Sequence, residues 1–171
     1  MKTVEAYLEE GLASDPRRAS VLAFHAKSLY WFDLAPASSH NHQFWDGGYR
    51  IHLNQCFIVA EMLYHNLQVL YGNPAFSFSS AIVVLYFHDI EKIWKYTNSL
   101  PKDFDKGFYY HNSLRTNHRI SFTDQESNAL MYVHGESDDY SADQRVMNEL
   151  AGFCHAVDVI SARVLHSKGV P

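Results

Sequence analysis

The sequence predicts an all-α domain of about six helices. Three observations support this fold class: apolar residues recur at intervals of three and four, residues typical of helix N-termini precede several of these stretches, and strand signals are weak. The best strand candidate, the β-branched run 82–84, is short and continues into a helical pattern without a turn. No repeat or low-complexity tract divides the 171 residues, so we expect one compact domain over 1–171.

Two helices are predicted in the first part of the chain. Asp15 and Pro16 offer an N-cap and a first helical residue. The apolar face that follows contains Val21, Leu22, Phe24, Leu29 and Phe32. A second helix is predicted over 49–70, after the double glycine 47–48, because apolar residues recur there at helical spacing.

The remaining helices are predicted from their capping residues. Ser79 is placed to cap a third helix, which we expect to run to about Tyr96. The segments 123–126 and 141–144 both fit the capping-box pattern, so each is expected to open a helix. The last helix is expected to end near 168–169.

Two segments, 35–46 and 97–122, do not fit the helical pattern and are predicted to be long functional loops. The second follows the predicted third helix directly and is basic in a protein that is acidic overall. Its basic residues are Lys102, Lys106, Arg115 and Arg119. We therefore predict that 97–122 is a substrate-binding flap for an anionic ligand.

Composition excludes several classes of function. The chain is 47% apolar and 19% charged, which is a globular balance, and it has a formal charge of -5 without a run of Lys or Arg. Duplex nucleic acid is therefore not an expected partner. The longest apolar run, 81–87, is too short to cross a membrane, and acidic residues near the start argue against a signal peptide.

The cysteines and histidines add information on location and chemistry. Cys56 and Cys154 each lie in an apolar helical stretch, where a buried free thiol is expected, so a cytoplasmic location fits best. Eleven histidines are many for this length and direct attention to metal or acid–base chemistry. Whether the chain forms a homo-oligomer stays open.

The pair His88-Asp89 is the most informative feature. It ends an apolar helical stretch, where a carboxylate is costly unless it is paired or bound to a cation. Neighbouring helical residues point about 100° apart, so an ion contacted by both needs ligands from other helices. His52 and Asp158 lie beside core positions on predicted helices. These four residues predict a site for one divalent ion, with Mn, Co, Fe, Ni, Zn and Mg not distinguished.

The order His52, then His88-Asp89, then Asp158 resembles the H…HD…D signature of the HD-domain superfamily of metal-dependent phosphohydrolases. The resemblance covers about 40–165, the expected metal-binding core. Three longer motifs are also similar: GGYRIH at 47–52 to GGxxxH, HDIEK at 88–92 to HDxxK, and HAVDVISA at 155–162 to an ADxxSA-like form.

The resemblance implies a phosphohydrolase acting on a small nucleotide or deoxynucleotide, of the nucleotidase or dNTP hydrolase type. Two alternatives stay open: a phosphodiesterase for a cyclic or oligomeric nucleotide, and a non-catalytic regulatory module that binds a metal or nucleotide. By resemblance, Lys92 contacts the scissile phosphate; a solvated lysine is the alternative. Glu91 replaces the usual HDIGK glycine and is assigned a catalytic role, as general base or as acceptor for a ligand histidine, with an exposed residue as the alternative.

Other candidates come from segments near these motifs. His111 and His118 lie close in sequence to Arg115 and Arg119, a combination suited to acid–base catalysis beside a phosphate, although ordinary loop residues would look similar. The residues assigned to substrate binding are Arg115, Arg119, His42 and Arg50. His134 with Glu136 resembles the HHE element of a second metal site, but Val133 replaces the first histidine, so one metal is expected.

Overall fold

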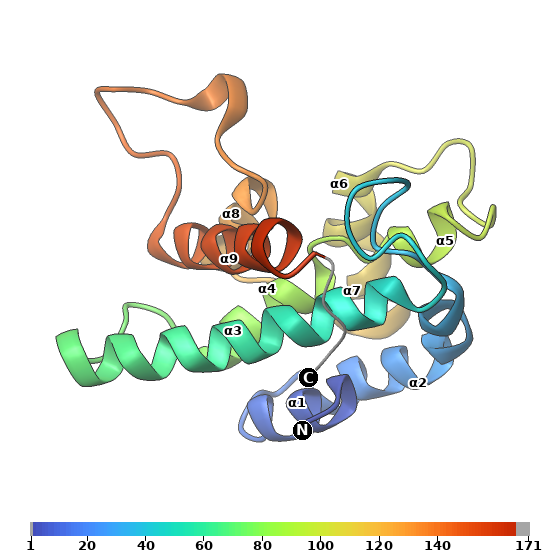
Figure 1. Ribbon diagram of the computed structural model, residues 1–171, viewed down its shortest axis with the longest axis horizontal. Coiled ribbons are helices and arrows are strands. Elements are labelled where there is room, and N and C mark those ends of the chain that lie inside the picture. The colour runs from blue at the N-terminus through green and yellow to red at the C-terminus, as the bar shows by residue number, and fades with distance from the viewer. Residues whose placement is uncertain (1, 167–171) are drawn as a thin grey trace.

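The computed structural model describes residues 2–166 and contains helices but no strand across them, which confirms the all-α fold class (Figure 1). Helices of eight or more residues are α1 (Val4–Gly11), α2 (Arg18–Leu34), α3 (Gly48–Tyr71), α4 (Phe78–Phe87), α8 (Asp124–Tyr132) and α9 (Glu149–Val159). Shorter segments are α5 (Lys92–Lys95), α6 (Lys106–Phe108), α7 (Leu114–His118), the π-helical turns Tyr109–Ser113 and Ile160–Val164, and the 3-10 turn Ser137–Asp139.

Helix α4 forms the centre of the core. Every residue from Ala81 to Phe87 is fully buried. In Figure 1 the long α3 crosses the molecule, with α8 and α9 on one side of it and α1 and α2 on the other. Because α4 packs against α1, α3, α8 and α9, its C-terminal end delivers the next residues into the interior.

The α4 helix is shorter than predicted at its C-terminal end. It stops at Phe87, and a turn separates it from α5, whereas the sequence pattern extended it to about Tyr96. The carbonyl of Phe87 accepts a hydrogen bond from the Tyr110 hydroxyl, and the carbonyl of His88 accepts one from Lys106 Nζ at 2.9 Å. Side chains from a distant segment therefore satisfy carbonyls that a longer helix would have used.

Capping patterns predict some helix starts correctly. Thr123 and Glu126 form the predicted capping box of α8. The cap of α4 is Ser77, whose side chain accepts from the Ser80 amide, and not Ser79 as predicted.

Asp15 and Ser141, predicted as N-caps, form local turns instead. Asp15 Oδ1 accepts from the Arg17 amide at 2.8 Å, and α2 begins only after that turn. Ser141 Oγ accepts from the Gln144 amide at 3.4 Å, while the cap of α9 is Asn148. Short polar side chains satisfy nearby amides with or without a following helix, so the sequence pattern does not separate the two outcomes.

About half of the segment 97–122, which was predicted as a loop, is helical. α6, the first π-helical turn and α7 form one continuous stretch from Lys106 to His118, and α7 packs against α2. Buried Tyr110 and Leu114 anchor this stretch to the core. The loop prediction is therefore wrong for about half of the segment.

At both ends of the described chain, the helices differ from those predicted. α1 was not predicted; Thr3 caps it, and Tyr7 and Leu8 bury against the core. The C-terminal helical stretch ends at Val164, and the predicted end at 168–169 lies outside the described residues. Within 2–166, no helix combines the length and apolar character needed to cross a membrane.

Candidate metal centre

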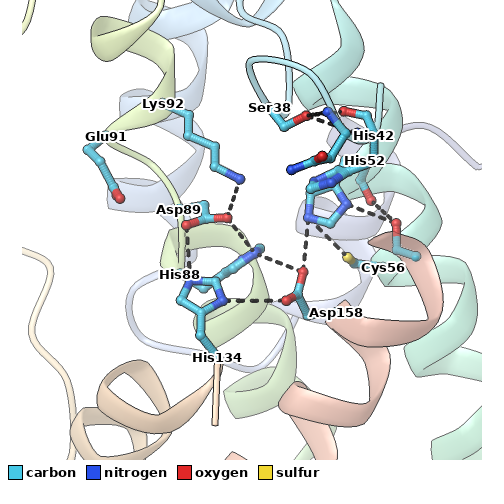
Figure 2. Close-up of polar contacts among 12 residues, drawn as sticks. Ser38, His42, His52, Cys56, His88, Asp89, Glu91, Lys92, His134 and Asp158 are labelled. Carbon is cyan, nitrogen blue, oxygen red and sulfur yellow. Dashed lines mark hydrogen bonds and ion pairs between the residues drawn. The ribbon is translucent and has the colours of Figure 1, made fainter. Parts of the chain in front are cut away.

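The four predicted metal ligands converge where α3, α4 and α9 meet (Figure 2). His52 lies on the first turns of α3, His88 and Asp89 follow α4 directly, and Asp158 lies near the end of α9. Both histidines are fully buried, and Asp89 is 5% exposed. The fold thus brings together side chains that are far apart in the sequence.

The ligand atoms of this metal cluster, defined as His52, His88, Asp89 and Asp158, face one another. Asp158 Oδ1 is 3.2 Å from His52 Nε2 and 3.6 Å from His88 Nε2, and Asp89 Oδ2 is 3.3 Å from His88 Nε2. Donors bound at about 2.0–2.2 Å around one tetrahedral ion lie about 3.4 Å apart. The separations in the metal cluster are close to this value.

Hydrogen bonds on the far side of each imidazole orient its Nε2 toward the carboxylates. His88 Nδ1 donates to the Leu85 carbonyl at 2.7 Å, which leaves Nε2 to act as a ligand. His52 Nδ1 is 2.9 Å from Ser161 Oγ, whose hydroxyl donates to Gln55 Oε1 at 3.0 Å. Such outer partners set the tautomer and orientation of metal-binding histidines. His88 Nε2 itself is buried and has no hydrogen-bond partner.

The electrostatics of the metal cluster call for positive charge. Burial lowers the pKa of His88, but the carboxylates of Asp89 and Asp158 outweigh burial and raise the pKa to about 10. Burial raises the pKa of Asp158, yet His134, His52 and His88 hold it well below its usual value. Burial lowers the pKa of His52, which favours its neutral, metal-binding form. A divalent cation would supply positive charge beside the carboxylates in place of the proton on His88.

His134 and Lys92 complete the surroundings of the two carboxylates. His134 Nε2 is 3.2 Å from Asp89 Oδ1, and its Nδ1 is 3.4 Å from Asp158 Oδ2, so this ring bridges both ligands. Lys92 Nζ is 2.6 Å from Asp89 Oδ2. Lys92 therefore lies at the centre, where its contact with phosphate stays a prediction, and His134, with its incomplete HHE pattern, contacts both carboxylates.

A pocket of about 500 Å³ opens onto this centre. Besides members of the metal cluster, its wall includes five basic or imidazole side chains: His42, Lys92, His134, His155 and Arg163. The His42 ring lies 5.2 Å from that of His52, and burial, together with His52 and Lys92, lowers the pKa of His42 to about 4. The predicted substrate residue His42 is thus brought to the centre.

A second pocket of about 510 Å³ meets the first at His134. It lies between the stretch that begins with α6 and helix α8, and it is lined in part by the apolar groups of Tyr110, Leu130 and Met131. The predicted residue His111 lines this second pocket. His134 therefore separates a polar pocket from a more apolar one.

Two predicted site residues are engaged elsewhere. Glu91 lies on the far side of Asp89 from His52 (Figure 2), and its carboxylate pairs with Lys106 Nζ at 3.0 Å. Arg50 forms ion pairs with Asp33 at 3.1 Å and with Glu5 at 3.4 Å. Glu91 therefore holds Lys106, which donates a hydrogen bond to the carbonyl of His88. Arg50 links α3 to α1 and α2 through its two ion pairs.

The remaining predicted residues lie away from the cluster. His118 packs edge-on against Phe24, with ring centroids 4.9 Å apart. Arg115 and Arg119 are exposed and line neither pocket. The arginine that does line the first pocket, Arg163, was missed. It follows Asp158 by five positions, which places α-helical residues about 140° apart, but the π-helical turn Ile160–Val164 alters that spacing.

Two donor sets in the described chain have all of their ligand atoms within 4.8 Å of one another: His52, His88 and Asp89, and His52, Cys56 and Asp158. The first set belongs to the predicted ligands. The second includes Cys56, which the sequence indicated only as a buried thiol.

Comparison with protein-family models, curated proteins and solved structures found no match to this chain.

Proposed function

We propose that this chain is a metal-dependent phosphohydrolase of the HD-domain type, which cleaves a phosphate ester of a nucleotide or deoxynucleotide. One divalent cation would be held by His52, His88, Asp89 and Asp158. The observation that carries the proposal is the buried Nε2 of His88, which faces two carboxylates and has no hydrogen-bond partner. Buried polar atoms nearly always form hydrogen bonds. A buried nitrogen that only ion-pairs with two carboxylates, at 3.3 and 3.6 Å, therefore suggests a ligand there.

The donor set fits this cation. Two imidazoles and two carboxylates suit Mn, Fe, Co, Ni and Zn. When bound, such an ion supplies Lewis acidity that activates water and polarises a phosphoryl oxygen. Cys56 and Cys154 are buried and free, as is usual in a reducing cytoplasm, where we expect the protein to act.

The residues of the first pocket have separate roles in this proposal. Lys92 and Arg163 would hold phosphate oxygens, because they bring positive charge to the wall beside the ligands. His134 would position both carboxylates through its two ring nitrogens. The second pocket, with its apolar wall, would accept the nucleoside part of the substrate.

The test is a screen of the purified protein against mono-, di- and triphosphate nucleotides with Mn, Co, Mg and Zn. We expect products to form only in the presence of a metal, as measured by chromatography and by a phosphate assay. The control variant is Asp33→Asn, which changes an exposed aspartate that lines neither pocket and should leave turnover unchanged. Stoichiometric metal binding without turnover on any substrate would refute catalysis and favour the regulatory module.

A phosphodiesterase is the second candidate. The two pockets adjoin at His134, so a diester could place one substituent in each. Release of inorganic phosphate from a nucleoside monophosphate indicates the first candidate, and cleavage of a cyclic or dinucleotide substrate without phosphate release indicates the second.

A further inference from the structure

Cys56 lies beside the predicted metal ligands. Its Sγ is 3.8 Å from His52 Nε2, and the close-up shows the sulfur directed toward the same region as Asp158 (Figure 2). Cys56 follows His52 by four residues on α3, so the two side chains project from one face of the helix. Cys56 is fully buried.

The geometry suits a shared ion. Zinc binds imidazole nitrogen at about 2.0–2.1 Å and thiolate sulfur at about 2.3 Å, so two such donors lie about 3.5–3.8 Å apart at tetrahedral to trigonal angles. The distance between Cys56 Sγ and His52 Nε2 falls at the upper end of this range. Asp158 Oδ1 is 3.2 Å from the same nitrogen, and the three donor atoms form one compact set.

A second observation points to a ligand beside this set. His88 Nε2, which belongs to the other donor set, is buried without a hydrogen-bond partner and lies 3.6 Å from Asp158 Oδ1, the same oxygen that faces His52. A buried cysteine usually behaves as a small apolar residue. Cys154 is the example of this ordinary role with which Cys56 can be compared. Cys154 is also fully buried but belongs to neither donor set of the described chain.

We propose that Cys56 is a thiolate ligand of the cation, and that the centre therefore prefers a thiophilic divalent ion of the zinc and cobalt class over magnesium or manganese. This inference rests on the metal centre of the proposed function. On binding, the thiol proton passes to solvent as the metal–sulfur bond forms, and no oxidation state changes.

Cobalt(II) tests this inference directly. Metal-free protein titrated with cobalt should develop an intense near-ultraviolet band from sulfur-to-cobalt charge transfer. Cys154→Ser should keep the band and Cys56→Ser should lose it. X-ray absorption of zinc-loaded wild-type protein should show one sulfur neighbour at about 2.3 Å. These measurements read the ligands and not the activity.

The affinity of the variants gives a second measure. Cys56→Ser should weaken zinc binding by more than the roughly 10- to 100-fold loss that follows removal of an outer partner of a ligand, and Cys154→Ser should not. Cobalt that binds without a sulfur band, or zinc without a sulfur neighbour, overturns the role of Cys56 but leaves the metal centre intact. Protein that binds neither metal overturns both. If Cys56→Ser does not fold, the wild-type spectra still decide.

Discussion

Two clusters of buried charge join distant segments of this protein, and they differ in how fully their members are paired. The anchor cluster consists of Asp15, Arg17 and Glu126. Arg17 donates to Glu126 at 2.7 and 2.8 Å and to Asp15 at 2.8 and 2.9 Å, so its guanidinium is held by two carboxylates. The Glu126 side chain is fully buried and also accepts from the Thr123 amide.

The metal cluster is buried to a similar degree but is not closed. Its nitrogen and oxygen atoms lie 3.2–3.6 Å apart, and His88 Nε2 has no hydrogen bond. Bidentate pairing satisfies the anchor cluster within the chain itself. The comparison teaches that burial of charge alone does not mark a functional site, whereas incomplete pairing of convergent ligand atoms does.

The largest expected effect is on turnover, which should fall when a carboxylate is neutralised in the metal cluster but not in the anchor cluster. Asp89→Asn keeps the shape of the side chain and removes its charge, so we expect loss of bound metal and a fall in kcat of at least about 10³-fold, or about 4 kcal/mol. Elemental analysis and turnover measure both, and circular dichroism should show unchanged helix content. The same substitution in the anchor cluster, Asp15→Asn, should retain metal and turnover. Equal turnover in both variants would show that the site is wrongly placed.

The next effect concerns stability. Arg17→Met leaves the carboxylates of Asp15 and Glu126 without their cation, which should cost about 3 kcal/mol, the lower end of the range for breaking a buried pair, because Arg17 is partly exposed. This corresponds to a fall in Tm of about 6–12 °C. Metal content and turnover of the folded variant should match the parent. A variant with parental Tm would mean that the anchor cluster contributes little to the fold.

A smaller effect should identify which arginine serves the metal cluster. Arg163→Ala should lower kcat/KM by roughly 1.5–3 kcal/mol, or about 10- to 150-fold, without loss of metal, because a hydrogen bond to a charged group is lost. Arg115→Ala and Arg119→Ala are matched controls and should behave like the parent, since neither arginine lines a pocket. A greater loss in either control than in Arg163→Ala would restore the flap that the sequence suggested.

The four residues of the metal cluster could be predicted because their signal is local. A His-Asp pair after a fully apolar stretch requires partners, and His52 and Asp158 stand next to core positions of their own helices. The capping box of α8 is local in the same way. Such features depend on neighbouring residues, so they can be predicted without knowledge of tertiary contacts.

The rest depends on contacts between distant segments. The break after Phe87 follows from hydrogen bonds donated by Tyr110 and Lys106, which no pattern within α4 reveals. His134 reaches both carboxylates from the end of α8, before a glycine with a φ of 106°. Arg163 reaches the pocket from within a π-helical turn. Periodicity assumes regular α-helix, so it misplaces residues wherever the helix departs from that geometry.

The smallest predicted effect is the acid sensitivity of the anchor cluster. The hydrogen bond from Arg17 lowers the pKa of Asp15 below its ordinary value of 3.8, against the opposing effect of burial. A carboxyl whose pKa is lower in the folded protein contributes its full stabilisation above the unfolded value, and this contribution is lost as the pH falls through the folded value. Wild-type protein should therefore lose stability more steeply than Asp15→Asn as the pH falls below about 5. Urea unfolding at several pH values measures the difference, and parallel profiles would show that the Asp15–Arg17 pair does not couple protonation to folding.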